Sequence, residues 1–219
     1  MLEKDKLKEI INEFKSELGN TTLVAVSKTK SNEDILKVYD LGIRDFGENY
    51  VQELVTKMDT LPKDIKWHMI GHLQTNKVKE LVKRNIYLIE SVDSIKLMQT
   101  INKEATRNNK IVNILIEVNI ANDENKTGCN IDDLDSLIKE SNNLPNIRLL
   151  GLMAIAPHTD DISLIRDAFK KMKLLKDQYN LDLLSMGMSH DYKIALEEGS
   201  NIVRIGSKIF GERIYNKKD

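Results

Sequence analysis

Short apolar segments alternate with longer segments of helical periodicity along the chain. The apolar segments are rich in residues that favour strands, and the segments between them repeat an apolar position every three or four residues, as amphipathic helices do. The alternation predicts eight strands, at residues 22–27, 43–46, 66–70, 86–90, 111–118, 147–153, 182–186 and 201–205. The segment at 111–118 is an almost continuous apolar run, which favours a parallel sheet covered by helices.

Two of the intervening helices are marked by regular apolar stripes. The stripes are Ile95, Met98, Ile101 and Ala105 in the first helix, and Ile165, Ala168, Phe169, Met172 and Leu175 in the second. Eight strand-helix units predict a single α/β domain, a (β/α)8 TIM barrel. An open doubly wound sheet would also alternate, but it usually has a glycine-rich phosphate turn after its first strand, and the turn here reads SKTKSNED.

Residues 1–20 predict an additional helix ahead of the barrel. One face carries five apolar residues, and Gly19 with Asn20 supplies a C-terminal stop. These apolar residues are Leu7, Ile10, Ile11, Phe14 and Leu18. Such a stripe can also bind a membrane surface, but in a chain without excess positive charge it favours packing against the core. We therefore expect one domain over residues 1–219, with a packing helix at 1–20 and the barrel at 21–215.

The charge and cysteine content narrow the range of partners. The 219 residues include 33 Lys and Arg and 34 Asp and Glu, so the formal net charge is -1. A chain without excess positive charge has no overall field that attracts nucleic acid or an anionic membrane. The single cysteine, Cys129, excludes an internal disulfide and a cysteine-based zinc framework. Because no apolar run resembles a signal peptide or a membrane span, we expect a cytoplasmic protein.

In a (β/α)8 barrel, functional side chains gather where the strands end and the βα loops begin. At the last predicted strand, the segment RIGSKIFGER brings Gly206 and Ser207 to a strand-helix junction, where N–H groups and a hydroxyl suit a phosphate. A tight turn with a serine N-cap would explain the same residues. Ser189, one strand earlier, would either donate a second hydroxyl to that anion or cap the helix predicted at 191–198.

Lys28 stands at the end of the first strand, where partial burial would lower the pKa of its ammonium group and leave an amine able to form a Schiff base. Lys30 points the same way if the strand continues, so the spacing does not separate the two lysines. A solvated side chain is the simpler interpretation of either position. Asn49 follows the second strand, where it would either bind a ligand or belong to a turn and helix cap, and Met153 ends the sixth strand.

His68 and His72 are four residues apart, which on a helix would place two imidazoles on one side. His68 falls in a predicted strand, however, and the sequence has neither an HExxH motif nor a cysteine near the pair. We therefore expect no metal site and interpret His68 as a packing residue.

Five segments resemble, in order and spacing, the pyridoxal phosphate homeostasis proteins, also called the YggS/PROSC family. They are LVAVSKTK, FGENYVQE, WHMIGHLQTNK, GLMAIAP and SMGMSHDYKIALEEGSNIVRIGSKIFGER. The resemblance implies a barrel like the N-terminal domain of alanine racemases, with pyridoxal 5'-phosphate (PLP) held as a Schiff base on Lys28.

The same resemblance implies roles for the other candidate residues. It assigns the phosphate to Ser189, Gly206 and Ser207, the pyridine nitrogen to Arg204, and the side of the ring to Asn49. With Lys28 and Met153, these complete the expected cofactor-binding set. Lys126, in the NDENKTG loop, matches a second lysine that is thought to matter for cofactor exchange.

Arg204 favours a carrier over an enzyme. PLP enzymes that need a strong electron sink protonate the ring nitrogen with a carboxylate partner, whereas an arginine donates a hydrogen bond to an unprotonated nitrogen. Racemases of the related fold also add a second domain, which we do not expect here because the barrel takes up nearly all of the 219 residues. We expect a monomeric PLP carrier without catalytic residues, which exchanges PLP with PLP-dependent apo-enzymes. A slow racemase-like amino-acid enzyme is the alternative, and an interaction protein with a vestigial cofactor ranks third.

Overall fold

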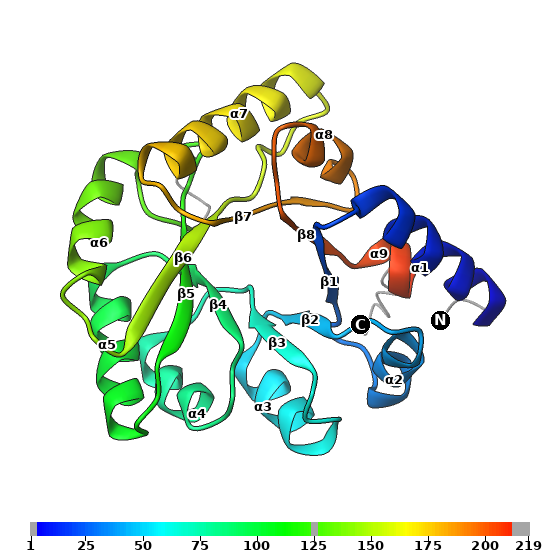
Figure 1. Ribbon diagram of the computed structural model, residues 1–219, viewed down its shortest axis with the longest axis horizontal. Helices are drawn as coiled ribbons and strands as arrows, with labels where there is room; N and C mark the ends of the chain where they lie inside the picture. Colours follow the sequence, from blue (N-terminus) through cyan, green and yellow to red (C-terminus); the bar gives the residue numbers. More distant parts are fainter. Residues whose placement is uncertain (1–3, 124–126, 212–219) are drawn as a thin grey trace, which may run out of the picture.

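Eight parallel strands, β1 to β8, close into a barrel in their order along the chain, and each is followed by a helix. The computed structural model describes residues 4–123 and 127–211. In Figure 1 the strands form a central ring that the helices surround. Pairing of β1 with β8, beginning with Thr22 beside Ile202, closes the sheet. The predicted (β/α)8 barrel is confirmed.

The strands are β1 (Thr22–Val26), β2 (Asp45–Glu48), β3 (Lys66–Met69), β4 (Leu88–Val92), β5 (Val112–Glu117), β6 (Ile147–Met153), β7 (Leu183–Met188) and β8 (Ile202–Ile205). The helices are α1 (Lys4–Leu18), α2 (Asn32–Asp40), α3 (Val51–Thr60), α4 (Val78–Val82), α5 (Ile95–Arg107), α6 (Leu134–Ser141), α7 (Ile162–Gln178), α8 (Tyr192–Glu197) and α9 (Ser207–Phe210). Short 3-10 helices, η1 (Thr75–Lys77) and η2 (Ile131–Asp133), precede α4 and α6.

Strands β2 and β4 begin and end about two residues later than the apolar pattern predicts. The pattern ends at residues 46 and 90, whereas β2 continues through Glu48 and β4 continues past Glu90 to Val92. Both carboxylates are fully buried, and both have charged partners inside the fold. Because those partners come from other strands and helices, the apolar pattern does not reveal that the strands continue.

Successive residues of each strand point alternately into the barrel and out toward the helices, so the protein has two apolar cores. Inside the barrel, a small cluster gathers side chains from five strands, namely Val24, Leu88, Leu115, Met153 and Ile202. The larger cluster lies between the strands and the surrounding helices. This arrangement leaves the ends of the strands, where the βα loops begin, free to carry polar side chains.

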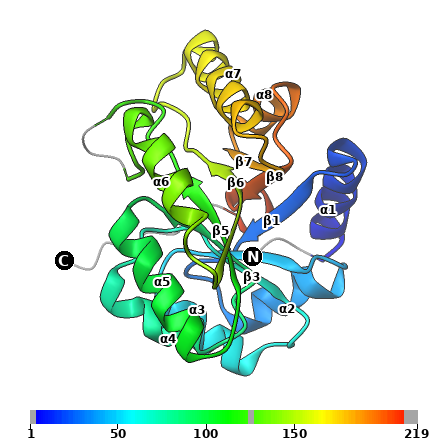
Figure 2. The ribbon, with the colours of Figure 1, turned by 60° about the vertical axis from the view of Figure 1, so that its left-hand side comes forward.

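Helix α1 packs beside the short helix α9 and against β1 (Figures 1 and 2). Four of the five predicted stripe residues are buried, and Ile10 is partly buried. Phe14 meets the ring of Tyr192 edge to face, with the centroids 5.5 Å apart. The chain turns away after Leu18 at Gly19, whose φ is +53°. Since α9 has only four residues, α1 covers a part of the barrel wall that a longer last helix would otherwise cover. No helix among the described residues has the length and apolar character of a membrane span.

Candidate cofactor site

A cavity of about 230 Å³ opens where β1, β7 and β8 end. Its lining includes five of the residues singled out from the sequence, namely Lys28, Ser189, Arg204, Gly206 and Ser207. The other described residues of the lining are Val26, Lys30, Met188, His190 and Gly211. Residues from both ends of the chain therefore converge on one site at the position expected for a barrel.

The glycine-serine junction forms one end of the cavity. Gly206 occupies the N-cap position of α9, and its N–H donates to Oγ of Ser189 over 3.4 Å. A Cβ built on Gly206 would come no closer than 3.4 Å to another atom, the Cβ of Val26, so the protein neighbours of this position do not require a glycine. The hydroxyl-bearing residues Ser189 and Ser207 thus line a space that can accept phosphate oxygens.

The alternative interpretation, in which Ser207 and Ser189 are helix N-caps, is wrong for both residues. Ser207 is the first residue of α9, and the cap position before it belongs to Gly206. Ser189 does not cap α8, because Asp191 is its N-cap and accepts the N–H of Met188 over 2.5 Å. Ser189 itself is buried, on the cavity wall.

The two candidate lysines, Lys28 and Lys30, both line the cavity but stand at different points of one turn. Strand β1 ends at Val26, and the chain then turns through Thr29, whose φ of +66° is unusual for a residue with a Cβ. The strand therefore does not continue to Lys30, and the period-two argument does not apply. Nζ of Lys30 donates to the carbonyl of Phe210 over 3.3 Å. Lys28 lies half-buried on the cavity wall at the middle of this turn.

Arg204 points from β8 into the barrel and forms the floor of the cavity, with 4% of its surface exposed. Its guanidinium donates to Oγ of Ser185 over 2.6 Å and to the carbonyl of Ala154 over 2.9 Å. Burial lowers the pKa of Arg204, while the charges of Glu90 and Glu117 act in the opposite direction. An arginine starts so far above neutral pH that it remains a cation and a hydrogen-bond donor here.

Beneath Arg204, a chain of polar groups crosses the barrel interior. Ser185 donates to Oε2 of Glu90 over 2.5 Å, and Oε1 of Glu90 lies 2.6 Å from Nδ1 of His68. Nε2 of His68 lies 3.1 Å from Oδ1 of Asp45. Desolvation opposes both charges, yet the pKa of His68 is raised and that of Glu90 is lowered, because each stabilises the charged form of the other. We call the five residues Asp45, His68, Glu90, Ser185 and Arg204 the inner network.

His68 and His72 do not form a common site. His68 is buried in the inner network, whereas the side chain of His72 is half-exposed and lies 3.5 Å from Asp93. Within residues 4–123 and 127–211, no group of three His, Cys, Asp or Glu side chains is placed to hold a metal ion. The interpretation of His68 as an interior residue is confirmed.

Two of the predicted residues that the structure describes are not on the cavity wall. Asn49 follows β2 and lines a neighbouring hollow of about 420 Å³, where its buried Oδ1 has no hydrogen-bond partner. Met153 is fully buried in the apolar cluster inside the barrel. Lys126 lies outside the described residues. Conversely, sequence analysis missed Met188 and His190 on the wall and Glu90 and Ser185 beneath it. Glu90 and Ser185 could have been found as polar residues within the otherwise apolar runs YLIES and LLSMGM.

Comparison with known proteins places this chain in a family. The family model of the alanine racemase N-terminal domain matches residues 2–214. A pyridoxal phosphate homeostasis protein of Aquifex aeolicus is 44% identical over 200 residues, which cover 88% of this chain and 87% of the relative. The human protein of that name is 39% identical over 217 residues, covering 90% of this chain and 78% of the relative. The chain belongs to the pyridoxal phosphate homeostasis protein family.

Solved structures agree with membership of this family. PipY of Synechococcus elongatus, solved with PLP bound, has a TM-score of 0.87 at 30% identity, covering 94% of this chain and all (100%) of that one. Alanine racemase of Streptomyces coelicolor has a TM-score of 0.79 at 15% identity, and the match covers 96% of this chain and 59% of the racemase. The second likeness shows the fold alone, which is the alanine racemase N-terminal-domain-like barrel.

Proposed function

We propose that this chain binds PLP in the cavity, holds it as a Schiff base on Lys28, and serves intracellular PLP homeostasis by buffering or delivering the cofactor. The observation that carries this proposal is the convergence in one cavity of an amine, two hydroxyls beside a glycine, and an arginine. The names of the homeostasis relatives and the PLP in PipY support it.

The residues present fit the cofactor. The part of the cavity lined by Gly206, Ser189 and Ser207 matches a phosphate group in donor chemistry. The unpartnered Oδ1 of Asn49 marks a buried acceptor in the neighbouring hollow, and contact of Asn49 with the ring stays a prediction. When bound, PLP supplies an aldehyde that an amine can attack.

Each of the proposed cofactor-binding residues then has its own role. Lys28 supplies the amine, and Ser189, Gly206 and Ser207 bind and orient the phosphate. Arg204 donates a hydrogen bond at the floor and, as a cation, does not give the pyridine nitrogen a proton. The cofactor is thereby held firmly but without the protonated ring that makes it a strong electron sink.

This arrangement favours a carrier without turnover of its own. Among residues 4–123 and 127–211, the lining of the cavity contains no tyrosine and no carboxylate that could serve with Lys28 as a second acid or base. We extend the proposal to a cytoplasmic monomer that passes PLP to PLP-dependent apo-enzymes, with Lys126 in the exchange step. Steady racemisation of an amino acid would support the alternative, a slow racemase-like enzyme.

The proposal is tested by adding PLP to the purified protein and recording the visible absorption of a Schiff base. Lys28→Ala should abolish the band, because the amine is lost while the phosphate cradle remains. Lys30→Ala, the matched control on the same wall, should keep it. Borohydride reduction followed by peptide mapping should place the adduct on Lys28. An adduct on Lys30 or on another lysine would overturn the site assignment.

A further inference from the structure

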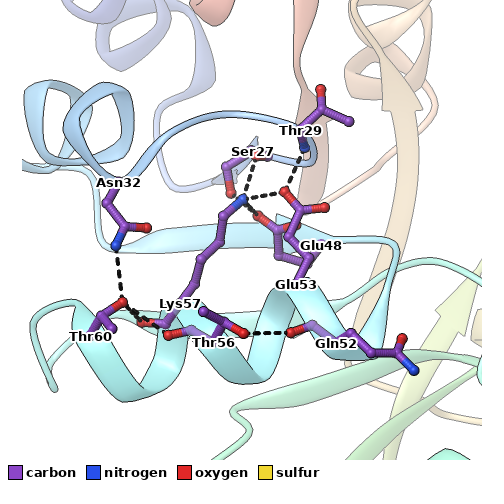
Figure 3. Close-up of polar contacts among 9 residues, drawn as sticks. All are labelled: Ser27, Thr29, Asn32, Glu48, Gln52, Glu53, Thr56, Lys57 and Thr60. Carbon is purple, nitrogen blue, oxygen red and sulfur yellow. Dashed lines mark hydrogen bonds and ion pairs between the residues drawn. The ribbon is translucent and has the colours of Figure 1, made fainter.

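The turn that carries Lys28 is held from outside the barrel by a buried lysine of α3. Nζ of Lys57 donates to the carbonyl of Ser27 over 2.9 Å, to Oε1 of Glu48 over 2.8 Å and to Oε1 of Glu53 over 2.6 Å. Figure 3 shows the Lys57 side chain reaching from its helix to a point between these groups. Only 6% of the Lys57 side chain is exposed.

Both neighbours of Lys28 are bound by the same carboxylates. Oγ of Ser27 donates to Oε1 of Glu48 over 2.6 Å, and the N–H of Thr29 donates to Oε1 of Glu53 over 2.6 Å (Figure 3). The backbone on each side of Lys28 is fixed by a charge-assisted hydrogen bond, from Lys57 to the carbonyl of Ser27 and from the N–H of Thr29 to Glu53, and such bonds are among the stronger kinds in proteins. Thr29 adopts a positive φ, and its bond to Glu53 offsets the free-energy cost of that conformation.

The composition of this cluster points to a positioning role. Two carboxylates face one ammonium, and Glu48 is fully buried with an Oε2 that has no partner. Burial raises the pKa of Glu48, although the charge of Lys57 and the hydroxyl of Ser27 lower it in part. Apolar side chains would fill such a space at less desolvation cost, so a buried cluster of this kind is a poor way to gain stability alone. What it supplies is a fixed geometry for the turn.

We propose that Glu48, Glu53 and Lys57 form a clamp that positions Lys28 for attack on the PLP aldehyde, although none of the three lines the cavity. This inference rests on the proposed function of Lys28. A lysine has four rotatable side-chain bonds, so the reach of its amine depends on where the turn holds its Cα. Releasing Thr29 would spread the amine over positions from which it attacks less often, which lowers its effective concentration at the aldehyde.

Glu53 offers the sharpest test, because its side chain is 25% exposed and its replacement leaves the apolar core intact. Glu53→Ala removes both the acceptor for Thr29 and the charge beside Lys57, whereas Glu53→Gln retains an oxygen that can accept the N–H. Each variant is titrated with PLP and with pyridoxine 5'-phosphate, an analogue that has an alcohol in place of the aldehyde and cannot form a Schiff base. The ratio of the two affinities isolates the step that needs Lys28.

Glu53→Ala should weaken PLP binding and slow formation of the Schiff base about tenfold, while pyridoxine 5'-phosphate binding stays within about twofold. Glu53→Gln should recover most of the loss. Glu140→Ala is the matched control, since this half-buried glutamate also bridges two helices by accepting from Gln99, and it should change neither affinity.

The outcomes separate the inference from the function on which it rests. If reduction of the wild type places no adduct on Lys28, the proposed function fails and the clamp falls with it. If the adduct is on Lys28 but Glu53→Ala leaves the ratio of affinities unchanged, the clamp alone is wrong. Equal weakening of both ligands would also overturn it, because a general loss of structure predicts that result. Equal losses in Glu53→Ala and Glu53→Gln would show that charge, and not the position of the turn, is what matters.

Discussion

Strand β2 separates two buried charge networks that prepare the same cavity from opposite sides. Asp45 and Glu48 are three residues apart on this strand, so their side chains point to opposite faces. Asp45 faces inward and begins the inner network, which ends at Arg204. Glu48 faces outward and belongs to the clamp with Lys57 and Glu53, which ends at the turn around Lys28.

The two networks differ in how their charges balance. In the inner network two carboxylates meet Arg204 and a histidine whose pKa is raised, and both oxygens of Glu90 have partners. In the clamp two carboxylates share one lysine, and Oε2 of Glu48 has no partner. The inner network, whose charges balance, keeps Arg204 charged. The clamp, whose charges do not balance, holds the turn around Lys28 in position. They should therefore respond differently to the loss of one member.

Loss of Glu90 should have the largest effect on stability. Glu90→Gln leaves Arg204 and His68 without their shared, fully buried counter-charge, and breaking a buried pair in this way costs about 3–5 kcal/mol. Urea unfolding at neutral pH measures the loss. Glu104→Gln is the matched control, because the pair of Glu104 with Arg107 has an exposed partner and should contribute at most about 1 kcal/mol. If the two variants lost the same free energy of unfolding, the inner network would stabilise the fold no more than a surface ion pair does.

Loss of Lys57 should cost less, about 2–3 kcal/mol, because Glu48 can take up a proton in its place. Burial already raises the pKa of Glu48, and removing Lys57, whose charge and hydrogen bond lower it, would raise it further. A group with a raised folded pKa contributes stability at low pH that is lost as pH rises through that pKa. The defect of Lys57→Met should therefore be smaller at pH 5 than at pH 7.

The matched control for this prediction is Lys110→Met. Nζ of Lys110 donates to three backbone carbonyls, those of Val82, Lys83 and Arg84, and faces no carboxylate in those bonds. Its loss should cost a similar amount at both pH values in urea unfolding. A defect of Lys57→Met that does not shrink at pH 5 would mean that Glu48 stays ionised without its lysine.

The contrast between the networks also explains what the sequence could predict. The barrel follows from periodicity, which records local burial, and the residues around the phosphate cradle follow from their positions at strand ends. Lys28, Ser189 and Arg204 were singled out in that way and lie in one cavity. The chemistry of these positions is visible locally, because each strand end is a fixed place in a barrel.

The residues that support the cavity were not predictable by the same reasoning. Ser185 and Glu90 are 95 positions apart in the sequence, and no local pattern pairs them. Glu48 was part of a segment interpreted as a turn and a helix cap, although it ends a strand and pairs with Lys57. Such partners are set by strand register and helix placement, which periodicity does not specify. Asn49 and Met153 show the converse, since a place at a strand end did not bring them to the cavity wall.

The smallest expected effect is a change in how stability depends on pH. Burial would lower the pKa of His68, but its bonds to Asp45 and Glu90 raise it above the ordinary value of 6.5. His68 therefore contributes stability that is fully present below pH 6.5 and is lost as pH rises through its folded pKa. One proton accounts for at most about 1.4 kcal/mol per pH unit. His68→Gln should remove this alkaline decline, while His158→Gln, at an exposed position, should keep it. Parallel curves of unfolding free energy against pH for the wild type and His68→Gln would mean that His68 is not charged in the fold, and the inner network would then carry one more negative than positive charge, as the clamp does.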